Sequence, residues 1–132
     1  MIRNWVAVTA CLALLGAGSS TPARAAVTQD NFLLQNTADF VAVCSADQKD
    51  PMMTAAANFC EGFIVGVYRT LQDEQAAMQS KLFCVVPPMP TRSVAISRFV
   101  AWAQSRPNVL SQKPEDAILA YLQERFPCAS SH

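Results

Sequence analysis

Hydrophobic side chains recur every three or four residues along most of the chain, which is the spacing of one face of an α-helix. The longest such series lies in the middle of the chain, where Phe59, Phe63, Val67 and Leu71 follow one another at intervals of four. Beyond Leu71 the residues become mostly polar, so the later turns of this helix should be solvated on most faces. The pattern predicts a helix from about residue 53 to residue 80.

A shorter amphipathic pattern precedes this helix and predicts a first helix between about residues 28 and 46. Its apolar side comprises Phe32, Leu33, Phe40, Val43 and Cys44. The polar segment 47–51 ends in proline and is therefore expected to form the turn between the two helices.

Two further helices are expected after the segment 85–90, whose three prolines prevent helix formation. Thr91 is a suitable N-cap for the third helix, which should end near Pro107. The apolar stripe of that helix comprises Val94, Ile96, Phe99, Val100 and Ala103, with Trp102 beside it. Pro114 suits the first turn of the fourth helix, whose apolar side comprises Ile118, Leu119, Tyr121, Leu122 and Phe126.

No alternating strand pattern longer than a few residues and no internal repeat interrupts this helical periodicity. The connections are short, so neighbouring helices should lie roughly antiparallel. The sequence therefore predicts an all-α fold: a small, disulfide-braced bundle of about four helices.

The first 25 residues have the organisation of a cleaved signal peptide, with Arg3 before a short apolar run and a small-x-small pattern ending at Ala25. Cleavage there would leave a single domain over residues 26–128 and a flexible tail over 129–132. It would also remove two arginines, so that 8 basic residues face 10 acidic ones and the net charge becomes −2. No long basic run remains, which argues against nucleic acid as a partner, and no later segment is apolar enough to span a membrane.

Four cysteines remain after the expected signal peptide, and an even number in a small exported domain is typical of disulfides. Cys44, at the end of the first helix, should lie near Cys60 in the early part of the second. The fourth helix should run back toward the end of the second, which brings Cys128 near Cys84. A pairing of Cys60 with Cys84 is disfavoured, because 24 helical residues span about 36 Å.

Residues suited to catalysis or metal binding are scarce in the sequence. The only histidine, His132, is at the end of the expected tail, and there is no paired CxxC motif for zinc. The neighbouring carboxylates Asp73 and Glu74 point about 100° apart on a helix, so they are more typical of a solvated face than of an acid–base pair. We expect no enzyme activity, no metal and no cofactor.

Gly62 and Gly66 have the small-x-x-x-small spacing that allows two helices to approach closely. Together with Phe63 and Val67 they are expected to form a packing surface for another helix of the same chain. A homodimer contact is the alternative.

The order of these features resembles the Rap/Tai family of type VI secretion immunity proteins. The shared framework is a first cysteine, a Cys-x-Gly-Phe-x-x-Gly helix, a cysteine before a proline-containing segment, a helix ending near proline and a closing Phe-Pro-Cys, here over about residues 40–128. One departure is an additional residue between Cys84 and Pro87. A second is Ser105-Arg106-Pro107, which stands where a histidine often precedes the proline in family members.

The resemblance implies a periplasmic helical protein, often dimeric, that binds and blocks a peptidoglycan-cleaving effector. Its partner would be a secreted cell-wall hydrolase, and the family supplies no rule for the contact residues. The candidate contacts are the polar end of the second helix and the segment after it: Asp73, Glu74, Gln75, Pro87, Pro88, Met89 and Arg92. The alternatives from other classes are a periplasmic acid-stress chaperone of the Hde kind and a structural envelope protein.

Overall fold

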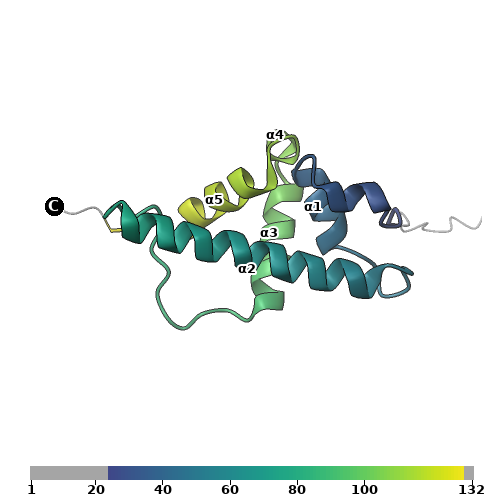
Figure 1. The fold of residues 1–132 in the computed structure, drawn as a ribbon, viewed down its shortest axis with the longest axis horizontal. Coiled ribbons are helices and arrows are strands. Elements are labelled where there is room, and N and C mark those ends of the chain that lie inside the picture. The colour runs from purple at the N-terminus through teal and green to yellow at the C-terminus, as the bar shows by residue number, and fades with distance from the viewer. Residues whose placement is uncertain (1–23, 130–132) are drawn as a thin grey trace, which may run out of the picture.

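The computed structural model describes residues 24–129, and all regular structure within that range is helical (Figure 1). The elements are η1 (Gln29–Leu33), α1 (Thr37–Cys44), α2 (Met53–Ala77), α3 (Arg92–Gln104), α4 (Pro107–Leu110) and α5 (Pro114–Arg125). The fold is therefore all-α, as the sequence predicts. Residues 1–23 of the expected signal peptide and 130–132 of the expected tail lie outside the described residues. Between residues 24 and 129, no helix has the length and apolar character needed to cross a membrane.

The first expected helix is interrupted at Leu34, whose backbone is left-handed with a φ of 48°. A short 3-10 helix, η1, precedes the break and α1 follows it. Asn36 is the N-cap of α1, because its side-chain oxygen accepts a hydrogen bond from the amide of Asp39 at 3.1 Å. The carboxylate of Asp39 also accepts a hydrogen bond from the Gln35 amide, at 3.1 Å, so local polar contacts fix the break.

Three residues of the expected apolar faces are exposed instead, among them Phe59 of α2, which is 36% exposed. Leu33 is 66% exposed, because it lies in η1 and the periodicity of α1 does not continue through the interruption. Val94 is 38% exposed, since it lies two residues, or about 200°, away from Ile96 around α3. The buried stripe of α3 is Ile96, Phe99, Val100 and Ala103.

Helix α2 is the longest element and ends at Ala77, three residues before the expected end. Gln79, with a φ of 53°, is left-handed just beyond it. The segment predicted to connect the third and fourth helices contains one further turn, α4, which begins at Pro107 as a proline-initiated helix.

Aromatic side chains join four helices into one core. Phe40 of α1 and Phe99 of α3 are completely buried, and their ring centroids are 5.8 Å apart. Phe63 of α2 lies 4.9 Å from Phe40, and Tyr121 of α5 meets Phe99 edge-on at 5.6 Å. Such contacts add to the free energy gained by burying the rings, so this cluster fixes how the helices cross.

The two disulfides have the pairing expected from the sequence. Cys44–Cys60 joins the end of α1 to α2, with the Cα atoms 5.2 Å apart. Cys84–Cys128 joins the segment after α2 to the residues after α5, with the Cα atoms 4.8 Å apart. Each disulfide closes a loop of the chain. Both therefore restrict the conformations that are open to the unfolded chain.

Candidate partner-binding surface

Residues 78–91, which we call the connecting segment, lead from the end of α2 to the start of α3. In Figure 1 the segment loops out below α2 and reaches the lower end of α3. At its end, the hydroxyl of Thr91 accepts a hydrogen bond from the amide of Val94 at 3.4 Å and so caps α3. This N-cap was expected from the sequence.

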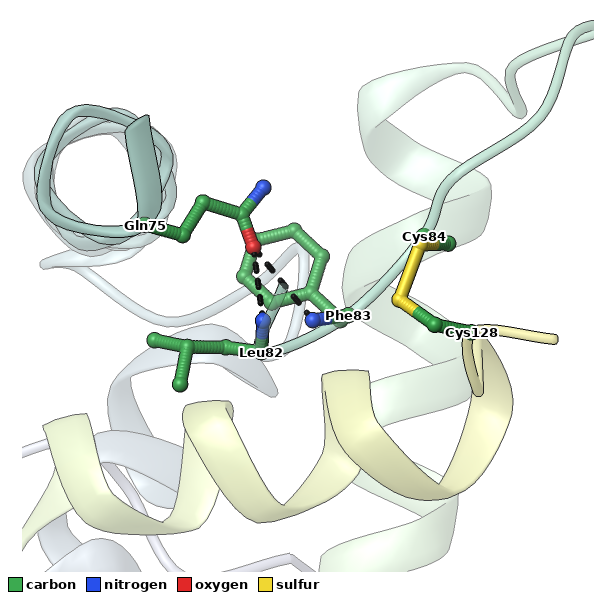
Figure 2. Close-up of a disulfide and its surroundings, with 5 residues drawn as sticks. All are labelled: Gln75, Leu82, Phe83, Cys84 and Cys128. Carbon is green, nitrogen blue, oxygen red and sulfur yellow. Dashed lines mark hydrogen bonds between the residues drawn. A yellow bond between two sulfur atoms is a disulfide. The ribbon is translucent and has the colours of Figure 1, made fainter. Parts of the chain in front are cut away.

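The beginning of the connecting segment is held by Gln75 (Figure 2). The side-chain oxygen of Gln75 accepts hydrogen bonds from the amides of Leu82, at 3.0 Å, and Phe83, at 3.4 Å. The Phe83 ring is buried, 2% exposed, beneath this contact. Gln75 was expected to face a partner, but its carbonyl oxygen is engaged in holding its own chain.

Cys84 continues this attachment. Its amide donates a hydrogen bond to the carbonyl oxygen of Phe126 at 2.8 Å. The disulfide between Cys84 and Cys128 lies next to this bond (Figure 2 shows the disulfide). The connecting segment is therefore tied to α2 at one point and to the end of α5 at another. The residues between Cys84 and Thr91 span the distance between two fixed ends.

An apolar cleft of about 290 Å³ lies between the connecting segment and helices α2, α3 and α5. Its floor consists of buried core side chains: Ile96, Ile118, Tyr121 and Leu122. Its walls include Ile64 and Tyr68 of α2 and Val85, Met89 and Pro90 of the connecting segment. The connecting segment packs on the core through Phe83 and Val85, and the exposed Met89 borders the cleft farther along.

Three arginines line the cleft: Arg69 of α2 and Arg92 and Arg98 of α3. No aspartate or glutamate is among the residues that line it. Arg92 approaches Glu61 at 3.9 Å, but both side chains are largely exposed, so this pair adds little stability. Among residues 24–129, no carboxylate lies within 4.0 Å of the guanidinium of Arg69 or Arg98. The cleft therefore has an apolar interior and a positively charged edge.

The surroundings of Tyr68, which lines the cleft, shift the ionisation of its phenol. Partial burial removes water from its hydroxyl and raises the pKa of the phenol above its ordinary value of 10.0. The hydroxyl accepts a hydrogen bond from the side chain of Gln72 at 3.1 Å. Tyr68 therefore stays neutral at physiological pH and adds a polar atom to an otherwise apolar wall.

The expected contact residues separate into two groups. Met89 and Arg92 line the cleft, and Pro87 and Pro88 are exposed just before them in the connecting segment. Asp73 and Glu74 are exposed on the later turns of α2 and do not line the cleft.

Arg69 and Arg98 were not predicted from the sequence. Each looks like an ordinary solvated residue of its own helix, because the periodicity of one helix carries no sign of a cleft formed by several elements. Only the crossing of α2, α3 and α5 brings them together with Arg92.

The expectation that Gly62 and Gly66 form an intramolecular packing surface is wrong. Both glycines are exposed, and a Cβ atom added at either position would meet nothing within 4 Å among the described residues. The neighbouring Phe63 and Val67 do pack against the core. The helix turns its glycines outward because its apolar stripe lies on the side of these larger residues. A homodimer contact at the glycines remains a prediction.

Within residues 24–129, no group of three or more histidine, cysteine, aspartate or glutamate side chains could hold a metal ion. All four cysteines in this range are in disulfides. The apolar cleft and the connecting segment anchored beside it are surface features suited to binding. The fold and surface are those of a small, disulfide-linked helical binding protein.

Comparison with protein-family models identifies the family to which this binding protein belongs. The family described as Rap1a immunity proteins matches residues 36–128, which is more than half of the chain, and the chain belongs to this family. The matched range contains both disulfides and the whole connecting segment. A search of curated proteins and a search of solved structures each found no match. The resemblance noted from the cysteine and glycine framework is confirmed.

Proposed function

We propose that this protein protects a bacterium by binding a peptidoglycan-cleaving effector of type VI secretion in the periplasm and blocking the effector's active site. The observation that carries the proposal is the family match over residues 36–128, since immunity proteins act by binding an effector protein.

The two disulfides support the choice of compartment. Disulfides form and persist in oxidising spaces such as the bacterial periplasm and are rare in the cytosol. The sequence of residues 1–25 has the organisation of a signal peptide, which would deliver the chain there. A peptidoglycan-cleaving effector acts in this same space, so inhibitor and target would meet.

The attachment of the connecting segment supports a steric mechanism. A surface that is already fixed loses little conformational entropy on binding, so more of the contact energy appears as affinity. The segment is fixed by Gln75 and by the Cys84–Cys128 disulfide, and its prolines restrict the backbone further. The exposed Pro87 and Pro88, together with Asp73 and Glu74 of α2, are the first candidates to contact an effector.

The test is protection against a defined hydrolase. A candidate hydrolase encoded beside the gene for this protein is directed to the periplasm of a bacterial host, alone or with the full chain. We expect lysis by the hydrolase alone and normal growth with the full chain. A chain without residues 1–25 should give no protection, because it would stay in the cytoplasm. Lysis that continues with the full chain, although the two purified proteins are folded, would contradict the proposal.

Inhibition of the purified hydrolase on isolated peptidoglycan then maps the contacts. Asp73→Lys and Glu74→Lys should each weaken inhibition if the polar end of α2 meets the effector. Asp30→Lys is the matched control, since Asp30 is also exposed but lies in η1. Equal inhibition by all three variants would remove the end of α2 from the contact surface.

A further inference from the structure

We infer that the cleft between α2, α3, α5 and the connecting segment is a docking site for an acidic segment of a partner protein that inserts one large apolar side chain. The inference deepens the proposed function, on which it rests for the identity of that partner as the effector. Three properties of the cleft carry it: its size, its charge and the spacing of its arginines.

The size of the cleft fits one large side chain and the backbone beside it. A cavity of about 150 Å³ already holds a benzene-sized ring, and this cleft has about 290 Å³. Its floor is made of buried residues that the fold holds in place, including Ile118 and Tyr121. Met89, which is 54% exposed on its wall, has the flexible, polarisable side chain that adapts to an inserted group. Such a preformed apolar pocket is where the anchoring residue of a protein interface is usually found.

The charge of the cleft selects an anionic occupant. Three of the nine lysines and arginines between residues 24 and 129 line it, and none of the ten aspartates and glutamates in that range does. The chain as a whole is not basic, with a formal net charge of zero. The positive charge at the cleft is therefore a local arrangement, complementary to carboxylates.

The spacing of the arginines favours a peptide over a single-headed amphiphile. Arg92 and Arg98 are six residues apart on α3, which corresponds to a rise of about 9 Å. Arg69 lies on a different helix. A single carboxylate carries one negative charge against three positive ones, whereas an acidic peptide with carboxylates on both sides of its anchor can pair with several of these side chains.

The test uses short peptides of defined sequence and needs no effector. The probe is a hexapeptide, blocked at both ends, with leucine and phenylalanine flanked on each side by two glutamates. One comparison peptide replaces the two apolar residues by glycine, and another replaces the glutamates by lysine. Decanoate serves as the single-headed amphiphile. Each is titrated into the ¹⁵N-labelled full chain, and the backbone amide shifts are followed.

We expect the acidic, apolar hexapeptide to shift the amides of Tyr68, Ala95 and Tyr121, which line the cleft. Each comparison peptide and decanoate should bind at least about tenfold more weakly, a difference of about 1.4 kcal/mol. Binding that needs only the glutamates, binding of decanoate as tight as that of the peptide, or shifts confined to other surfaces would each overturn the inference.

Two independent variants make the result specific to the cleft. Ala95→Trp fills the space, and the double variant Arg69→Glu and Arg98→Glu reverses the charge; each should weaken the hexapeptide at least about tenfold. The matched control reverses Lys49 and Lys81 together, which are exposed and do not line the cleft. The arginine variant alters only exposed side chains, so it decides the question even if Ala95→Trp disturbs folding. Unchanged affinity in that variant would overturn the inference.

The two proposals fail separately. Absence of peptide binding would overturn the docking site and leave the protection assay with the hydrolase unaffected. Absence of protection would contradict the proposed function, while specific binding of the hexapeptide would still identify the cleft as a site for an acidic protein segment.

Discussion

The amide of Cys84 donates a hydrogen bond to the carbonyl oxygen of Phe126 at 2.8 Å, beside the disulfide between Cys84 and Cys128. A covalent bond and a hydrogen bond therefore attach the connecting segment to the end of α5 at the same point. The two cysteines are 44 residues apart, and the loop they close contains α3, α4 and α5. The other disulfide closes a much shorter loop of 16 residues.

The difference in loop length predicts an order of stability for the two disulfides. Replacing Cys84 and Cys128 together by alanine should lower the free energy of unfolding by about 4 kcal/mol, and replacing Cys44 and Cys60 by about 3 kcal/mol. The physical reason is that the longer loop restricts the unfolded chain more. Guanidinium denaturation of the two double variants and the parent measures both values. A larger loss for the Cys44–Cys60 variant would show that native packing around that bond outweighs chain entropy.

The contact between Gln75 and the connecting segment predicts a specific role for one side-chain oxygen. Gln75→Ala should lower the free energy of unfolding by about 1 kcal/mol, because two amides lose their acceptor. It should also speed hydrogen exchange at Leu82 and Phe83. Gln75→Glu keeps an acceptor at the same place and should retain most of the protection.

Gln72→Ala is the control for this experiment, since Gln72 lies one turn earlier on α2 and contacts the Tyr68 hydroxyl instead. Its exchange rates at Leu82 and Phe83 should equal those of the parent. Equal rates in Gln75→Ala would show that the segment is held without the Gln75 side chain.

The open space beside Gly62 and Gly66 predicts that alanine is the better residue at both positions in the monomer. Each substitution should raise the free energy of unfolding by about 0.5–1 kcal/mol, because alanine has the higher helix propensity and its methyl group meets no neighbour. Thermal or chemical denaturation measures the change. The same variants should be examined by sedimentation, because a homodimer formed through the glycines would be weakened by the added methyl groups. Loss of stability together with dissociation would establish the glycines as a dimer contact.

Burial of Tyr68 predicts a decrease in stability at high pH. The pKa of the phenol is raised in the folded state by desolvation, so the folded protein holds this proton more tightly than the unfolded chain. The resulting stabilisation is complete below the ordinary pKa of 10.0 and is lost as the pH rises through the folded-state pKa. Tyr68→Phe should remove this part of the pH dependence. The measurement is the free energy of unfolding from pH 8 to pH 11, with tyrosinate absorbance followed in parallel, and identical curves for parent and variant would contradict it.

The helices could be predicted from the sequence because they depend on local information, and the disulfide pairing followed from the order of the helices and their short connections. A helix buries one face, so residues such as Phe99 and Ala103 of α3 recur at the helical period. Short connections make neighbouring helices antiparallel, and this was enough to pair Cys44 with Cys60 and Cys84 with Cys128. Helical periodicity was misleading at Leu33, because the left-handed residue Leu34 follows directly and ends the helical repeat there.

The candidate site was only partly predictable. The sequence indicated Met89 and Arg92 through the proline-rich segment, but it did not indicate Arg69, Arg98 or the engagement of Gln75 within the chain. A polar side chain on a predicted helix face has the same sequence pattern whether it faces solvent, a partner or another part of the chain. Its surroundings come from elements that are far apart in the sequence.

The sequence by itself thus determined the all-α fold class, most helix positions, the covalent framework and the family. Tertiary structure alone decided that α2 turns Gly62 and Gly66 outward and that three arginines surround one apolar cleft. The physical reason is the range of the interactions involved. Helix periodicity, capping and proline effects act over a few residues, whereas a cleft depends on the crossing of α2, α3 and α5 and on the path of the segment that passes over them.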